Sequence, residues 1–279
     1  MSTNADSSIA QRMVRVFGEA GAAQCGEVRP DFVATEVPVA LVFNGISHAV
    51  MMASPEHLED FALGFALSEG ILDALADVRG VRVRRVIEPA LLPTGVPGFE
   101  VHLDVSARSF ARLRERRRSL AGRTGCGMCG VESLAALELT PARMAPRAWA
   151  ERVDLASVLA AFGALEQWQP HNARTGSLHA AGWARLGGSL AAVREDIGRH
   201  NALDKLIGWL ARAGEMTEPG FVVLSSRGSH ELVRKCARVG IAALATISAP
   251  TATGVVVAEN AGVRLWGLCR APRGVLYVP

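Results

Sequence analysis

Three short apolar runs in the second half of the chain, at residues 221–224, 241–247 and 263–268, constrain its fold most strongly. Each run has the length of a strand and is bounded by turn residues. A stretch with helical character lies between each run and the next. Because strands that alternate with helices are typical of α/β proteins, we predict an α/β sheet for this half.

The first half of the chain shows a different pattern, of short strands around one helix. The strand-like segments are residues 37–43, 48–52, 81–86 and 99–105. Asn44-Gly45 is a hairpin turn signal between the first two. A helix is predicted to begin at Ser54-Pro55, since Ser caps helices well and Pro suits the first helical position, and to end at Gly70. This half therefore indicates a smaller α+β domain.

A length of 279 residues allows two modest domains. Pro141 and Pro146 make residues 140–147 the best boundary between them. We predict a flexible tail at residues 1–30 with one strand-like piece at 13–17, an N-terminal α+β domain at 31–143, and a C-terminal α/β domain at 144–279.

Charge and hydropathy exclude several classes of partner. Thirty basic and 27 acidic residues give a net charge of only +3, which does not require a nucleic-acid partner. No apolar run approaches the roughly 20 residues of a membrane span, and the first 30 residues contain no signal-peptide core. We therefore expect a cytoplasmic protein with reduced thiols, without a membrane partner.

The cysteine pattern points to one loop. Five cysteines are too few, and too thinly spread, for a disulfide framework. Only Cys126 and Cys129 are close together, in the Gly-rich loop 122–130. Such a pair can be half of a zinc site, a redox dithiol, or a nucleophilic thiolate with a neighbour. The sequence contains no second Cys-x-x-Cys pair for zinc, and an Arg-rich segment at 106–123 replaces the strand expected before a redox dithiol.

The nucleophile interpretation fits the surroundings of the pair best. A helix is predicted just after the loop, at 131–137, and a helix N-terminus favours an anion. Arg123 adds positive charge three residues before Cys126. Both effects lower the pKa of a thiol, and the thiolate is the form that attacks. A Gly-rich loop could also carry the sulfur between partners.

Three groups of polar residues in the second half could hold phosphate or another polar ligand. Ser225–Ser229 resembles an anion cradle at a strand end, although an ordinary capped turn has the same composition. Arg270 and Arg273 could add phosphate contacts. Charged residues also crowd the helix start at 195–205, and the Arg-rich segment could be a solvated helix face or a docking surface.

His179 needs separate treatment because zinc deaminases use a His-x-Glu motif followed by Pro-Cys-x-x-Cys. Here Ala181 stands where that Glu would be, and the Cys-x-x-Cys pair precedes the histidine. The base and the motif order are both missing, so a structural histidine is the better interpretation.

Several motifs in a fixed order resemble one family, the formate dehydrogenase accessory sulfurtransferases (FdhD proteins). They cover most of the chain, from residue 59 onward. The matching segments are residues 59–70, 126–132, 175–181, 195–205, 226–228 and 248–251.

The resemblance implies a sulfurtransferase that accepts persulfide sulfur from a cysteine desulfurase. It would pass that sulfur to the molybdenum bis(pterin guanine dinucleotide) cofactor of formate dehydrogenase. The family's persulfide-carrying cysteine matches Cys126, with Cys129 as its neighbour. The family's contacts with the guanine dinucleotide, for which GDP is a mimic, match a segment of six residues: Leu268, Cys269, Arg270, Ala271, Pro272 and Arg273.

The resemblance also implies a homodimer, and a C-terminal domain with a cytidine deaminase-like fold. No permanently bound metal is expected. Two alternatives remain open: a non-catalytic chaperone that binds and inserts the pterin cofactor, and a zinc hydrolase of the deaminase type.

Overall fold

A computed structural model describes residues 7–17, 26–87, 96–118 and 141–279. Its largest sheet has six strands in the order β12-β11-β10-β9-β7-β8. The central strands β9, β10 and β11 run parallel, and β7, β8 and β12 pair antiparallel with their neighbours. These strands are β7 (His179–Arg185), β8 (Leu190–Asp196), β9 (Gly220–Leu224), β10 (Ala243–Thr246), β11 (Arg264–Arg270) and β12 (Arg273–Val278). The three apolar runs thus form the parallel centre of the sheet.

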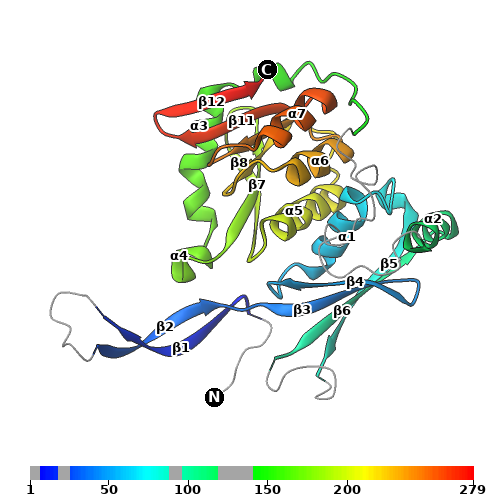
Figure 1. Cartoon of the computed structure of the whole chain (residues 1–279), viewed down its shortest axis with the longest axis vertical. Helices are drawn as coiled ribbons and strands as arrows, with labels where there is room; N and C mark the ends of the chain where they lie inside the picture. The colour runs from blue at the N-terminus through cyan, green and yellow to red at the C-terminus, as the bar shows by residue number, and fades with distance from the viewer. Residues whose placement is uncertain (1–6, 18–25, 88–95, 119–140) are drawn as a thin grey trace.

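Helices cover both faces of this sheet (Figure 1). Residues alternate along the strands, so that Val222 and Leu224 pack in one apolar cluster and Phe221 and Val223 in the other. One face carries α5 (Arg199–Ala213), α6 (His230–Arg238) and α7 (Ala252–Ala261), and the other carries α3 (Leu155–Leu165). Short helical turns are η3 (Ala150–Arg152), η4 (Glu166–Trp168) and α4 (Asn172–Thr175). The predicted α/β class is confirmed, while the cytidine deaminase-like arrangement stays a prediction.

The first half forms a four-stranded sheet in the order β4-β3-β6-β5. Its strands are β3 (Val37–Phe43), β4 (Ile46–Ala53), β5 (Val78–Val86) and β6 (Gly98–Val105), and its helices are α1 (Leu58–Ser68), α2 (Ala107–Arg118) and the turn η1 (Leu75–Asp77). All four predicted strands are present. The predicted helix start is wrong, because α1 begins at Leu58, after a left-handed His57. Ser54 does not cap it, since its Oγ accepts the backbone N–H of Ile197 at 3.3 Å.

The N-terminal segment contains more structure than its composition suggested. The strand-like piece predicted at 13–17 is β1 (Ile9–Val16), which pairs antiparallel with β2 (Glu27–Ala34) as a separate two-stranded ribbon. This ribbon extends away from the body of the molecule (Figure 1). Arg174 of α4 lies over the Phe32 ring at 3.8 Å, so β2 contacts the C-terminal half.

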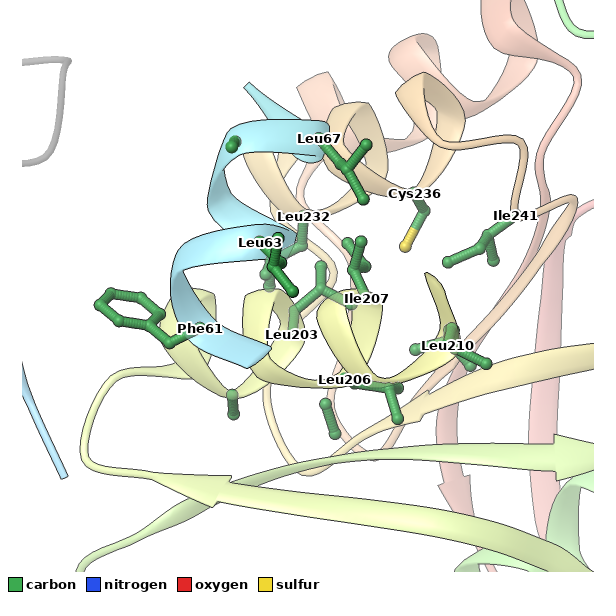
Figure 2. Close-up of a cluster of buried hydrophobic side chains, with 14 of the residues drawn as sticks. Phe61, Leu63, Leu67, Leu203, Leu206, Ile207, Leu210, Leu232, Cys236 and Ile241 are labelled. Atoms are coloured by element: carbon green, nitrogen blue, oxygen red, sulfur yellow. The ribbon is translucent and has the colours of Figure 1, made fainter. Parts of the chain in front are cut away.

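The two halves share one hydrophobic core. Helix α1 packs along α5, and Leu63 and Leu67 of α1 lie beside side chains of α5 (Figure 2). Leu232 and Cys236 of α6 complete this cluster. The division at 140–147 stays a prediction, but the parts on either side of it are packed as a continuous apolar unit.

Close approach of α1 and α5 depends on glycine at two crossing positions. A Cβ on Gly64 would overlap the backbone carbonyl oxygen of Asp204, and a Cβ on Gly208 would overlap that of Asp60. We expect Gly64→Ala to lower the free energy of unfolding by about 2–3 kcal/mol, because the backbone of α5 must move to admit the methyl group.

The matched control is Gly163→Ala in α3, where nothing lies within 4 Å of the new Cβ. That change should raise stability by roughly 0.4–1 kcal/mol, since alanine loses less backbone entropy on folding. Urea unfolding of both variants measures the difference. If both substitutions change the free energy of unfolding by the same amount and with the same sign, then Gly64 is not required for the close approach of α1 and α5.

A buried polar cluster ties the end of α1 to α5 and α6. Lys235 Nζ contacts both carboxylate oxygens of Asp204 at 2.9 Å, and Ser68 Oγ donates to Asp204 Oδ1 at 2.7 Å. Glu69 pairs with Arg234 Nη2 at 2.9 Å and with Lys235 Nζ at 2.8 Å. Although burial opposes it, the charge of Lys235 and then that of Arg234 lower the pKa of Glu69 to about 2.

This shift predicts acid sensitivity. Because the folded-state pKa of Glu69 lies below its ordinary value of 4.5, the stability it contributes is full above about pH 5 and is lost as the pH falls through about 2. The contribution is about 3 kcal/mol. Glu69→Gln should flatten the fall in unfolding free energy between pH 5 and pH 2, measured by urea titration at each pH. The exposed Glu166→Gln serves as control, and an unchanged slope in Glu69→Gln would refute the assignment.

Within the described ranges, no helix is both long and apolar enough to cross a membrane.

Candidate functional site at the carboxyl edge of the large sheet

The loops at one edge of the six-stranded sheet lie side by side. The carboxyl ends of β8, β9, β10 and β11 meet there, together with the first residue of β7, His179, which pairs with Asp196. Backbone hydrogen bonds join consecutive loops: Leu268 N–H donates to Ser248 O at 3.2 Å, and Ser248 N–H to Ser226 O at 3.4 Å. In open α/β sheets this edge is where ligands bind. Several of the predicted polar segments therefore meet on one side of the molecule.

The predicted cofactor segment is the turn between β11 and β12. Arg270 and Arg273 lie opposite each other across this hairpin, and both are exposed. Ala271 and Pro272, joined by a cis peptide bond, form the exposed tip, and Leu268 before it is half-buried in a left-handed conformation. Two guanidinium groups at an exposed turn can bind phosphate through charge-assisted hydrogen bonds.

Cys269 differs from its neighbours in this segment. Its side chain is fully buried in the apolar cluster beneath the turn, and burial raises the pKa of its thiol to about 11. A contact between Cys269 and a ligand at the surface could be made only by its backbone. The sequence does not show that the Cys269 side chain faces the core, because the register of the strand and its turn decides which residues of the segment point inward.

His179 lies at the centre of the edge. Its Nδ1 is 3.4 Å from Ser225 Oγ, and Ser225 Oγ accepts the backbone N–H of Ala180 at 2.8 Å. Burial lowers the pKa of His179, and the nearby positive charge of Arg199 lowers it further. The imidazole is therefore a neutral hydrogen-bonding group at neutral pH.

Asp196, Asn201 and Lys205 of the crowded motif at 195–205 hold the edge in place. Lys205 Nζ lies 2.7 Å from Asp196 Oδ2, and both side chains are completely buried. Asp196 also accepts the backbone N–H groups of Ser54 and Gly198 at 3.0 and 2.9 Å, and Asn201 Nδ2 at 3.0 Å. This network fixes the start of α5 against the segment that leads from β4 to α1.

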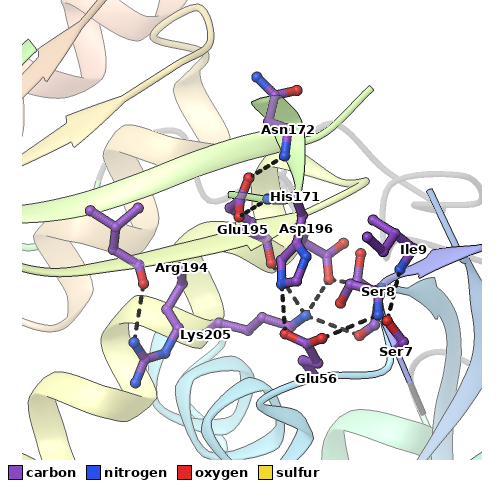
Figure 3. A network of polar contacts seen from close by, with 12 residues as sticks. Ser7, Ser8, Ile9, Glu56, His171, Asn172, Arg194, Glu195, Asp196 and Lys205 are labelled. Atoms are coloured by element: carbon purple, nitrogen blue, oxygen red, sulfur yellow. Dashed lines mark hydrogen bonds and ion pairs between the residues drawn. The ribbon is translucent and has the colours of Figure 1, made fainter. Parts of the chain in front are cut away.

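A second part of this network reaches the N-terminal ribbon (Figure 3). Glu195 accepts the backbone N–H groups of His171 and Asn172 at 3.1 and 2.8 Å. Glu56 accepts the Ser8 N–H at 3.2 Å and lies 3.0 Å from His171 Nε2. These contacts were not predicted, since they join segments between 23 and 115 residues apart.

The scarcity of lysine was the sequence signal for the buried ion pairs. Lys205 and Lys235 are the only lysines in a chain with 30 basic residues, and both are buried against carboxylates. A compact ammonium group fits a small buried site that the planar guanidinium of arginine would not.

The structure describes two of the five cysteines, Cys236 and Cys269, and both are free and buried. Burial raises the pKa of Cys236 to about 12. Cys126, Cys129 and the predicted helix at 131–137 lie outside the described residues. Among the residues that are described, no three His, Cys, Asp or Glu side chains gather as a metal site would require.

Comparison with known proteins identifies relatives across most of the chain. The model of the FdhD/NarQ family matches residues 34–279. Proteins named sulfur carrier protein FdhD from Burkholderia cenocepacia and Chromobacterium violaceum are each 51% identical, covering 88% and 90% of this chain and 87% and 91% of their own. A crystal structure from Desulfotalea psychrophila, of a protein named as a formate dehydrogenase accessory protein, superposes with a TM-score of 0.67. It is 20% identical and covers 97% of both chains, so it supports the fold alone.

Proposed function

Because this chain belongs to the FdhD/NarQ family, we propose that it is a sulfur carrier for the maturation of a formate dehydrogenase. The observation that carries the proposal is 51% identity, over 88% of the chain, to a relative named as a sulfur carrier. The Cys126-Gly-Met-Cys129 loop supplies the thiols that such a carrier needs. The activity is sulfur transfer, and we place it in the cytoplasm.

The first step is thiol exchange. The Cys126 thiolate attacks the outer sulfur of a persulfide on a cysteine desulfurase. The S–S bond of that persulfide breaks, its inner sulfur leaves as the desulfurase thiolate, and Cys126 becomes the persulfide. No external oxidant or reductant is needed, and the rate follows the thiolate fraction, nucleophilicity and access of Cys126. Cys129 is the adjacent thiol that assists this step or resolves the persulfide.

The second partner is the client cofactor, a molybdenum bis(pterin guanine dinucleotide), which we treat as the substrate that receives sulfur. The segment Leu268–Arg273 is proposed to contact its guanine dinucleotide part, with Arg270 and Arg273 as the exposed cationic groups. The cytidine deaminase-like C-terminal domain would carry this segment, and the protein would act as a homodimer.

The test is the intact mass of the full chain after incubation with a cysteine desulfurase and cysteine. We expect a gain of one sulfur atom that a reducing agent removes, and fragment masses that place it on Cys126. If the chain gains no sulfur but still supports formate dehydrogenase maturation, the protein is a cofactor chaperone and the carrier function is wrong.

A further inference from the structure

Three basic side chains at the carboxyl edge have no part in the network around Asp196. They are His179 at the start of β7, Arg199 at the start of α5, and Arg227 in the loop after β9. Arg227 is exposed, and within the described residues only its backbone carbonyl, not its guanidinium, takes part in a hydrogen bond. Arg199 Nε is buried and finds no hydrogen-bond partner among them. A buried polar atom without a partner requires an explanation, and a bound anion would supply one.

The acidic groups near these cations are already engaged. Asp196 pairs with Lys205 at 2.7 Å, and Glu231 with His200 Nε2 at 2.5 Å. Glu195 accepts two backbone N–H groups of the α4 segment. Among the described residues, no carboxylate forms an ion pair with the guanidinium of Arg199 or Arg227, so both groups can bind an anion from outside the protein.

The tautomer of His179 decides which of its nitrogens donates. The Ser225 hydroxyl lies 3.4 Å from Nδ1 and can donate a proton to it or accept one from it. In the tautomer in which Ser225 donates to Nδ1, the N–H of the neutral ring is at Nε2. In that tautomer His179 offers one uncharged donor near the Arg199 guanidinium, and Arg227 follows Ser225 by two residues in the same loop.

Two helices begin at this edge without a side-chain cap. The N-cap residues Gly198 of α5 and Ser229 of α6 make no capping hydrogen bond, whereas Asp154 caps α3 and Thr251 caps α7. Ser229 Oγ is also buried without a partner in the described part of the chain. Free N–H groups at a helix start favour an anion, which adds to the side-chain evidence.

We propose that His179, Arg199 and Arg227 form an anion-binding subsite that takes the diphosphate of a nucleotide whose other contacts lie at Arg270 and Arg273. The inference rests on the proposed function, because it gives a further subsite to the same cofactor. Neighbouring strands are about 4.8 Å apart, so this row of loops extends about 20 Å from β11 to β8. That length suits an extended ligand better than a single phosphate ion.

Isothermal titration of the full chain with GDP, inorganic pyrophosphate and guanosine tests the subsite. We expect Arg227→Ala and Arg199→Ala each to weaken GDP and pyrophosphate binding by about tenfold or more and to leave guanosine binding unchanged. Arg227→Lys should lose less, because it keeps the charge but not the planar donor pair. Arg273→Ala should weaken GDP binding too. Arg79→Ala, an exposed arginine of β5, is the matched control and should bind like wild type.

Wild-type affinity for GDP and pyrophosphate in both Arg227→Ala and Arg199→Ala would overturn the subsite. Thermal melting of each variant identifies any that loses its fold. The carrier function is tested separately, by the gain of sulfur on wild-type protein. If wild-type protein gains no sulfur but Arg227→Ala weakens pyrophosphate binding, the carrier function is refuted and the subsite stands. If wild-type protein gains sulfur but Arg227→Ala and Arg199→Ala bind pyrophosphate normally, the carrier function stands and the subsite is refuted.

Discussion

Replacing Cys126 by alanine should abolish both the added sulfur and the maturation of formate dehydrogenase. The reason is that a persulfide carrier needs an accessible thiol with thiolate character. Cys236 and Cys269 cannot replace it, since burial raises their thiol pKa values to about 12 and about 11. Fewer than one such thiol in a thousand is ionised at neutral pH by the ordinary titration relation, and neither is exposed. The intact mass after desulfurase treatment, and formate dehydrogenase activity in a complemented deletion strain, measure the two effects.

Cys269→Ala is the matched control for this prediction. It removes a thiol at the edge of the large sheet, and its sulfur loading should equal that of wild type. Cys129→Ala separates the roles of the two loop thiols: full loading with lost maturation would assign Cys129 to a later step. Full sulfur loading of Cys126→Ala would exclude Cys126 as the carrier.

Local sequence patterns predicted the elements of the fold well. The runs at 221–224, 241–247 and 263–268 became β9, β10 and β11, because buried central strands are continuously apolar over a short length. The strands of the first half were also correct, since Asn44-Gly45 forms a turn between β3 and β4. These features depend on residues close in sequence.

Contacts between distant residues explain what local patterns missed. Ser54 is a residue type that caps helices, but its hydroxyl accepts the backbone N–H of Ile197, 143 residues away, and the helix starts at Leu58. The tail at 1–30 looked loose, yet β1 pairs with β2, and Glu56 binds Ser8. These contacts cannot be predicted from the pattern of apolar and polar residues within the tail or within the segment before α1.

The candidate site was predicted in pieces rather than as a whole. Arg270, Arg273 and Ser225–Ser229 were singled out as possible phosphate contacts, and the parallel topology places their loops at the same edge. His179 was interpreted as a structural histidine, because its motif lacks the deaminase glutamate. Only the pairing of β7 with β8 and β9 shows that it lies between Ser225 and the start of α5.

Asp196→Asn should destabilise the protein more than any other single change at the edge. Four donors converge on the two carboxylate oxygens: the N–H groups of Ser54 and Gly198, Asn201 Nδ2 and Lys205 Nζ. Asparagine supplies one acceptor oxygen and turns an NH₂ group toward donors. It also removes the negative charge that the buried Lys205 ammonium faces, and Lys205 keeps the neutral carbonyls of Ser54 and Glu195, at 3.0 and 3.4 Å.

Breaking a buried ion pair from one side costs about 3–5 kcal/mol, because the remaining charge is uncompensated. We therefore expect the free energy of unfolding of Asp196→Asn, measured by urea titration, to fall by that amount. Asp104→Asn is the control: it breaks the pair with Arg82, which is 3.3 Å long and largely exposed, and should cost about 0–1 kcal/mol. If the two variants lose similar amounts of unfolding free energy, then the buried Asp196–Lys205 pair does not hold the start of α5 in place. A large loss in Asp196→Asn alone would show that the buried network around Asp196 holds the start of α5. Because Arg199 is the first residue of α5, the anion subsite would then depend on this network, although the network itself binds no ligand.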